Sequence, residues 1–173
     1  RGRAAMQRID EVLATAPSIA DRPDAARVDR LRGEVEFRNL SFRYDAGREE
    51  ALRGVSLQVP AGSVLGVVGP IGSGKSTLAS LIPRLFEVPD GQLFLDGVDV
   101  NRIPLRTLRS HIAMVPQDAF LFSMSLAENV AYGLPEAEPG RVHEAAERAQ
   151  LAKDVAELPD AYDTLVGERG VML

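Results

Sequence analysis

A glycine-rich stretch between two apolar segments is the feature that most constrains this sequence of 173 residues. It reads Gly69-Pro70-Ile71-Gly72-Ser73-Gly74-Lys75-Ser76-Thr77, which has the G-x-x-x-x-G-K-S spacing of a phosphate-binding loop. The apolar run 64–68 precedes it, and a second apolar segment, 78–82, follows it. The pattern predicts a strand, a tight turn and the start of a helix, which is the structural context that the motif requires.

The residue types of this loop suit the binding of a nucleoside triphosphate. Glycines at 69, 72 and 74 lack Cβ, so the backbone can turn tightly and point its N–H groups at anionic oxygens, while the following helix adds its positive end. Lys75 supplies a cation for the β- and γ-phosphates, the Ser76 hydroxyl is placed to ligate Mg²⁺, and Thr77 can donate near the α-phosphate. We therefore predict that residues 69–77 bind a nucleotide with Mg²⁺.

Charge and composition exclude several other classes of protein. The net charge is −5 and no basic patch is visible, so no nucleic-acid partner is expected. The chain has no cysteine, which rules out a disulfide framework and thiolate chemistry. No apolar run approaches the roughly 18 residues of a membrane span, and no signal peptide is recognisable. Because the sequence starts at Arg1 and stops at Leu173 without a cap or tail, we expect a piece of a longer polypeptide.

The first third of the chain is predicted to form a helix, a linker and two strands. Residues 1–16 have helical periodicity, and the charged segment 17–32 is expected to be a linker. From Gly33 onward, apolar and polar residues alternate, but the phase slips at Arg38-Asn39, which predicts a β-bulge or tight turn. The alternating segment 55–59 predicts a second strand, and together the two strands suggest an antiparallel sheet.

The remaining pattern predicts an α/β core followed by helices. The continuous apolar runs 64–68 and 112–115 are interpreted as strands buried on both faces. A helix with an apolar stripe through 78–86 should follow Lys75, interrupted by Pro83. Asp96-Gly97 predicts a hairpin between 92–95 and 98–100. Helices are expected at 104–110, 125–132, 139–151 and 152–158.

Four segments resemble the nucleotide-binding domain of an ATP-binding cassette (ABC) exporter of the half-transporter type. Residues 33–44 resemble the opening strands of that domain, and 51–57 resemble the segment before the phosphate loop. Val115-Pro116-Gln117-Asp118 matches the Q-loop, and Val166-Gly167-Glu168-Arg169-Gly170 matches the segment that precedes the signature sequence in exporters. The resemblance covers essentially the whole chain. It implies a P-loop NTPase core with an antiparallel β subdomain and the start of a helical subdomain.

The resemblance also implies roles for individual residues. Tyr44 would stack on adenine, and Gln117 would contact Mg²⁺ and the attacking water, so that Lys75 and Gln117 take part in catalysis. Residues 1–32 would be the end of the last transmembrane helix and the linker, and 33–173 the N-terminal part of the cassette, with the helical subdomain from about residue 118.

The implied partners are a transmembrane domain of the same polypeptide and a second cassette, in a homo- or heterodimer. The implied activity is ATP hydrolysis coupled to export, at the cytoplasmic face of the cell membrane.

Several motifs of the family would lie beyond this sequence. The signature should begin near Leu173, and the Walker B aspartate, the catalytic glutamate that serves as general base, and the switch histidine should follow it. We therefore expect that the 173 residues alone do not turn over ATP and fold poorly, because the Walker B strand normally lies beside the strand before the phosphate loop.

Two alternative functions remain open at this point. A catalytically silent cassette paired with an active one agrees with every residue present, and the segment 122–129 departs slightly from the commonest exporter pattern. A soluble ABC ATPase of DNA repair or translation would lack the linker-like residues 1–32 and the segment 166–170.

Four further residues receive structural interpretations. Leu93-Phe94-Leu95-Asp96 looks like a Walker B strand, but Gly97 makes it a hairpin, so Asp96 is not expected to bind Mg²⁺. His111 and His143 lack metal-ligand spacing and are expected on the solvent side. Glu168 could contact transmembrane loops or the partner cassette, or form only a charge pair at a helix end.

Overall fold

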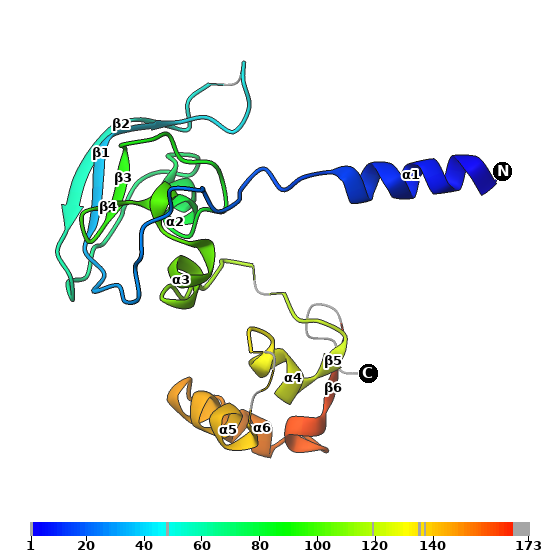
Figure 1. Cartoon of the computed structure of the whole chain (residues 1–173). Helices are drawn as coiled ribbons and strands as arrows, with labels where there is room; N and C mark the ends of the chain where they lie inside the picture. Colours follow the sequence, from blue (N-terminus) through cyan, green and yellow to red (C-terminus); the bar gives the residue numbers. More distant parts are fainter. Residues whose placement is uncertain (1, 48, 119, 135, 137, 168–173) are drawn as a thin grey trace. The chain divides into compact units, whose positions relative to one another are not determined.

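The computed structural model describes all residues except 1, 48, 119, 135, 137 and 168–173 (Figure 1). The chain divides into two compact units, Arg1–Ala113 and Met114–Leu173. The expected contact of Glu168, and most of the segment 166–170 that resembles exporters, lie outside the described residues.

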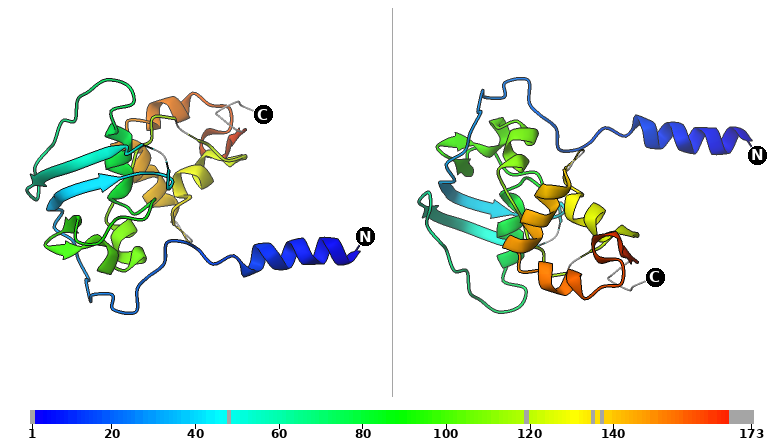
Figure 2. Two further views of the ribbon diagram at one scale, coloured as in Figure 1. Left: turned by 90° about the horizontal axis from the view of Figure 1, so that it is seen from above. Right: turned by 90° about the horizontal axis from the view of Figure 1, so that it is seen from below.

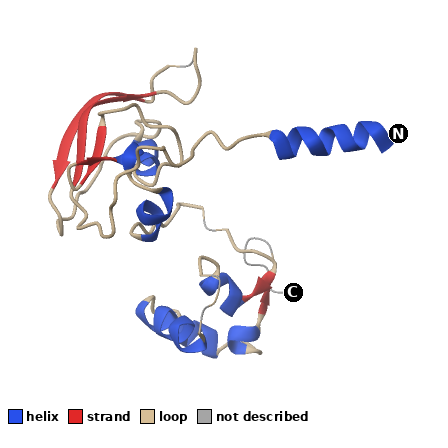
Figure 3. Ribbon diagram, in the orientation of Figure 1, coloured by secondary structure: helices blue, strands red, loops and turns tan. Residues whose placement is uncertain are grey.

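The first unit begins with helix α1, Gly2–Ala14, which confirms the helix expected at the N-terminus. Its apolar residues Met6, Ile9 and Leu13 are exposed. Among the described residues, no helix has the length and hydrophobicity that crossing a bilayer requires. The segment from 15 to 34 contains neither helix nor strand, in agreement with the predicted linker (Figure 3).

A four-stranded antiparallel sheet forms the body of this unit, in the order β2-β1-β3-β4. β1 is Val35–Phe42 and β2 is Leu52–Val59, and the two run side by side in each view of Figure 2. β3 is Leu93–Leu95 and β4 is Val98–Asp99. The sheet packs its apolar side chains into a core that includes Phe37, Leu40, Leu52, Leu81, Leu93, Val100, Ile103 and Leu108.

The predicted slip in β1 is confirmed as a bulge. The register against β2 shifts between Phe37 and Leu40, so both side chains are buried although they are an odd number of residues apart. Asn39 absorbs the change with a left-handed φ of 48°, a conformation that asparagine tolerates better than most residues. Its N–H donates to the Ser56 hydroxyl at 3.0 Å.

The Asp96-Gly97 hairpin is also confirmed. β3 and β4 pair directly, and both turn residues have positive φ, 51° and 79°, as a type I′ turn requires. The Asp96 carboxylate accepts the backbone N–H groups of Arg32, Gly33 and Glu34, which pins the end of the linker to the hairpin.

Two predicted strands are wrong. Residues 64–68 and 112–115 have no strand assignment, and Val64, Val68 and Val115 are 98%, 94% and 94% exposed. A strand exists through hydrogen bonds to its neighbours, and no strand among the described residues pairs with either segment. Both segments are apolar, but an apolar composition does not by itself supply a neighbouring strand to pair with.

The helix after the phosphate loop, α2, spans Lys75–Leu81 and is shorter than the apolar stripe predicted. Pro83 cannot donate to the helical ladder, so the chain leaves the helix at Ile82, and Arg84 turns with φ 51°. A short helix η1, Val100–Arg102, and helix α3, Leu105–Ser110, complete the first unit, and α3 agrees with the predicted helix there.

The second unit is mainly helical, as the sequence predicts. It contains α4 (Leu126–Ala131), α5 (Pro139–Arg148), α6 (Ala152–Ala156) and η2 (Ala161–Asp163). The strands β5 (Met124–Ser125) and β6 (Leu165–Val166) form a short antiparallel pair. His143 is exposed and stacks on Tyr162 with ring centroids 4.2 Å apart, and His111 of the first unit is also exposed, as expected for both histidines.

Candidate nucleotide-binding site

The loop between 69 and 77 adopts a conformation that glycine makes possible. Gly72 and Gly74 have φ values of 82° and 86°. A Cβ on Gly74 would lie 2.6 Å from the carbonyl oxygen of Ala51 and 2.7 Å from Leu52 Cδ2, so no larger residue fits there. Gly74 also accepts the first helical hydrogen bond of α2, from the N–H of Leu78 at 2.9 Å. The tight turn predicted from the motif is therefore present.

Lys75 folds back over the loop that precedes it. Its Nζ donates to the carbonyl oxygens of Gly69 at 2.9 Å and Pro70 at 2.7 Å, and to the Ser73 hydroxyl at 3.3 Å. These oxygens hold the ammonium group at the loop, which is where the phosphates of a nucleotide would lie in a motif of this type. Ile71, at the tip of the loop, is fully exposed.

Tyr44 lies beside the start of α2. Its hydroxyl shares a hydrogen bond of 2.7 Å with the Thr77 hydroxyl, and Thr77 is buried. The Tyr44 ring packs edge-on against Phe42 and Phe86, with centroids 5.1 and 5.0 Å away, yet the residue stays 47% exposed. The ring is therefore held in place and still has surface available for a ligand.

These residues surround one small cavity of about 290 Å³. It is lined by Tyr44, Ala51 and residues 72–77, so the predicted aromatic platform and the phosphate loop are brought together. Sequence reasoning missed Ala51, whose carbonyl closes the wall behind Gly74, and Phe86, which braces Tyr44. The apolar stripe included Phe86 but gave no sign that it meets an aromatic residue 42 positions earlier.

The two predicted protein ligands of Mg²⁺, Ser76 and Gln117, both carry neutral oxygens. Ser76 is exposed at the start of α2, and no described residue takes its hydroxyl. The described residues contain no group of three or more His, Cys, Asp or Glu side chains that could hold a metal. A hydroxyl is a hard oxygen ligand and Mg²⁺ keeps several waters or phosphate oxygens, so Ser76 fits as a single protein ligand.

Gln117 belongs to the second unit, where it lies in an exposed bend with Asp118. The phosphate loop belongs to the first unit. The sequence-based role of Gln117 at Mg²⁺ and the attacking water thus stays a prediction.

Comparison with known protein families gives an independent result. A model of the ABC transporter family matches residues 52–172. A protein of Bacillus subtilis named for multidrug export, the ATP-binding/permease protein YgaD, is 44% identical over 170 residues. An ATP-dependent lipid A-core flippase of Aromatoleum aromaticum is 44% identical over 176 residues. The match covers 98–100% of this chain but only 29% of each relative, so the chain spans about three tenths of their length.

A solved structure also matches. A bacterial Atm1-family ABC exporter with ATP bound superposes with a TM-score of 0.85 at 40% sequence identity. The match covers 98% of this chain and 30% of the exporter chain. The fold of this chain is therefore that of an ABC cassette, including the P-loop NTPase core and the antiparallel subdomain that the sequence predicted.

Proposed function

Because this chain belongs to the ABC transporter family, we propose that it is the ATP-binding part of an exporter, in which ATP binding and hydrolysis drive transport across a membrane. The observation that carries the proposal is the cavity that joins Tyr44 to the phosphate loop at 72–77. The names of YgaD, a multidrug export protein, and of the matched structure, an ABC exporter, support the direction of transport. Membership of the family does not by itself show that this chain binds or hydrolyses ATP.

In the proposed site, the adenine base stacks on the exposed face of Tyr44 and the phosphates lie in the loop 69–77. An aromatic ring stacks on a base with a free energy of roughly 1–3 kcal/mol. Lys75 exchanges its contacts with Gly69, Pro70 and Ser73 for phosphate oxygens. The residues of the loop thus neutralise and position the triphosphate, which is most of what a protein contributes to phosphoryl transfer.

Ser76 and Gln117 would be the protein ligands of Mg²⁺. When bound, Mg²⁺ would neutralise charge on the β- and γ-phosphate oxygens. The Gln117 side chain would orient the attacking water, and the general base would come from sequence outside these 173 residues.

The proposed partners follow from the lengths of the relatives. The name of YgaD combines an ATP-binding and a permease function, and this chain matches 29% of the length of YgaD and of the flippase. We propose that residues 1–32 link the cassette 33–173 to a transmembrane domain of the same polypeptide, at the cytoplasmic face of the membrane. A second cassette would complete the ATP site.

The test is Lys75→Ala in the full-length protein, with ATP affinity and ATP turnover measured for each form. We expect both to be lost, because no other described cation contacts the loop. Lys153→Ala is the control, since Lys153 is an exposed lysine of α6 in the second unit. Normal ATP binding and turnover by Lys75→Ala would refute the proposed site. Binding without turnover in the wild type would instead indicate a silent cassette.

A further inference from the structure

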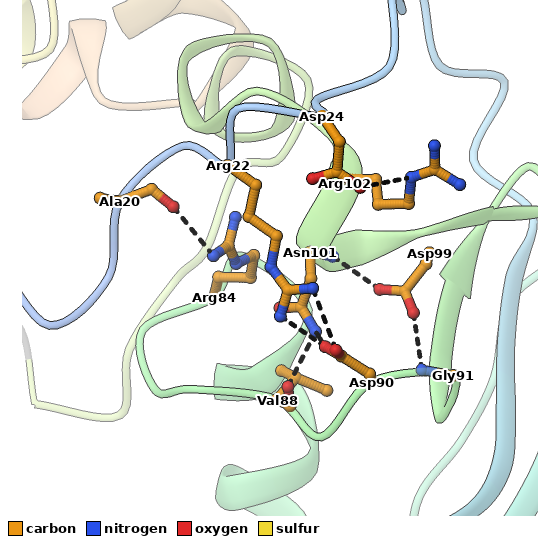
Figure 4. Close-up of polar contacts among 10 residues, drawn as sticks. All are labelled: Ala20, Arg22, Asp24, Arg84, Val88, Asp90, Gly91, Asp99, Asn101 and Arg102. Carbon is orange, nitrogen blue, oxygen red and sulfur yellow. Dashed lines mark hydrogen bonds and ion pairs between the residues drawn. The ribbon is translucent and has the colours of Figure 1, made fainter.

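Part of the linker is fastened to the surface of the first unit by charged groups (Figure 4). The Arg22 guanidinium donates to both carboxylate oxygens of Asp90, with Nη1–Oδ2 at 3.0 Å and Nη2 on Oδ1. This two-point geometry fixes orientation as well as distance. The sequence analysis treated residues 17–32 simply as a linker and gave no reason to expect this contact between residues 68 positions apart.

Three further contacts hold the same stretch. The Asp21 carboxylate accepts the N–H of Leu105 at 2.7 Å, at the start of α3. The N–H of Ala26 donates to the carbonyl oxygen of Arg102 at 2.7 Å, and the Arg102 guanidinium lies 3.5 Å from the Asp24 carboxylate. We call these contacts, together with the Arg22–Asp90 pair, the linker clasp.

The residues around Asp90, which accepts from Arg22, are held by hydrogen bonds that do not involve the linker. Asn101 is only 3% exposed, and its side-chain amide donates to Asp90 Oδ1 at 2.9 Å and to the Val88 carbonyl oxygen at 2.8 Å. Asp99 accepts the N–H groups of Gly91 at 2.6 Å and Asn101 at 2.8 Å. Asp90 is therefore held in one orientation by a buried side chain, which reduces the entropy lost when Arg22 binds it.

Arg84 contacts the linker at Ala20, but it also places a buried positive charge beside the clasp. It is 4% exposed, its Nη2 donates to the Ala20 carbonyl oxygen at 3.3 Å, and its Nε and Nη1 have no partner among the described residues. Burial lowers the pKa of Arg84, and the nearby positive charge of Arg22 lowers it further. A buried cation with unpaired N–H groups is unfavourable, so Arg84 offsets part of the stabilisation that the clasp contacts provide.

The residues just before the clasp line a cavity at Tyr44. Ser18 and Ile19, with residues 41–44 and 85–89, enclose about 590 Å³. Tyr44 also lines the smaller cavity of the phosphate loop, so it is common to both. The linker thus forms one wall beside the residue proposed to bind the base.

We propose that Arg22 is a positioning residue of the nucleotide site. Through Asp90 it keeps Ser18 and Ile19 against the cavity at Tyr44, so that binding of the base depends on the position of the linker. This inference rests on the proposed function, because it assumes that a nucleotide base binds at Tyr44.

The test compares two ligands in the full-length protein, ATP and inorganic triphosphate, which has phosphates but no base. Arg22→Gln and Asp90→Asn should each raise the dissociation constant of ATP by about 1.4- to fivefold, the range for an exposed ion pair, and leave that of triphosphate unchanged. The double variant should lose no more than either single one. The difference from wild type should shrink in about 1 M salt, where exposed charges are screened.

Two controls make the outcome specific. Arg148→Gln removes another exposed arginine–carboxylate pair, the single contact Arg148–Glu144 at 2.6 Å in the second unit, and should leave ATP affinity unchanged. Arg22→Lys keeps the charge without the two-point geometry and should give a smaller loss than Arg22→Gln.

Unchanged ATP affinity in Arg22→Gln, or an equal loss for ATP and triphosphate, would overturn the inference. Failure of the wild type to bind either ligand would instead contradict the proposed function.

Discussion

At the scale of single residues, the site depends on backbone conformations and ring contacts that leave little freedom for substitution. Gly74 is backed by the carbonyl of Ala51, and Tyr44 is braced by two aromatic rings and by Thr77. The motif predicted the glycine, and the family resemblance predicted the tyrosine. Phe42 is close to Tyr44 in sequence, but Thr77 and Phe86 are far from it, as Ala51 is from Gly74, and no local spacing reveals such contacts.

Gly74→Ala should impair ATP binding. The alanine would have to keep φ near 86°, at roughly 1–2 kcal/mol of strain, and its Cβ would press on Ala51. Because each 1.4 kcal/mol is about tenfold in affinity, we expect a loss of at least about tenfold by calorimetry on the full-length protein. Gly140→Ala in α5 is the control, since no atom lies within 4 Å of its Cβ position. Equal affinities for the two variants would contradict this interpretation of the loop.

Tyr44 variants separate the ring from its hydroxyl. Tyr44→Ala removes the proposed stacking surface and should weaken ATP binding by roughly 1–3 kcal/mol. Tyr44→Phe keeps the ring and loses only the hydrogen bond to Thr77, so its effect should be much smaller. Equilibrium titration with ATP checks both. A similar loss in the two variants would show that the hydroxyl, and not the ring, matters.

At the scale of elements, local pattern predicted some features well and others poorly. The bulge at Asn39 and the hairpin at Asp96-Gly97 were readable because both depend on residues close in sequence. The apolar runs 64–68 and 112–115 were not, because a buried strand requires neighbours that the run itself does not specify. The Arg22–Asp90 pair could not be predicted for a related reason. Charged residues are spread along the whole sequence, and nothing local indicates which of them form ion pairs.

The hairpin aspartate offers a test that depends on pH. Burial disfavours the charged form of Asp96, but the N–H groups of Arg32, Glu34 and Gly33 outweigh it and hold the pKa below its ordinary value. The ionised carboxylate therefore stabilises the junction fully above about pH 4, the unfolded value, and this contribution is lost as pH falls through the lower folded pKa.

Asp96→Asn should therefore expose the junction at neutral pH. We expect hydrogen exchange at the amides of 32–34 to lose at least about tenfold in protection in the full-length protein, as a hydrogen bond to a charged group is worth roughly 1.5–3 kcal/mol. The difference from wild type should shrink below about pH 4. Asp29→Asn, in the exposed linker, is the control. A difference that persists unchanged at low pH would exclude the ionised carboxylate as its cause.

At the scale of the whole molecule, the described chain leaves aliphatic side chains in water. Val64, Val68 and Val115 are nearly fully exposed, and the antiparallel sheet holds most of the buried core of the first unit. Each Å² of apolar surface that stays in water lacks the roughly 25 cal/mol of stabilisation that burial would give. A domain has only roughly 5–15 kcal/mol of net stability.

The 173-residue chain should therefore be marginal by itself. Circular dichroism should show a broad thermal transition, and a dye that fluoresces on apolar surface should bind below it. The control is the same measurement on the full-length protein, which should melt more sharply. A single sharp transition of the isolated chain, without dye binding, would contradict this prediction.

The clasp has a mechanical consequence for the linker. Helix α1 ends at Ala14, and the carbonyl oxygen of Ala20 accepts a hydrogen bond from Arg84. A fully extended chain spans at most about 3.3–3.6 Å per residue, so the segment from Ala14 to Ala20 can extend to at most roughly 20 Å. A pull on α1 beyond that length acts first on the Ala20–Arg84 hydrogen bond and then on the Arg22–Asp90 pair. These contacts follow directly after Ser18 and Ile19, which line the cavity at Tyr44, so breaking them would make the nucleotide site sensitive to force.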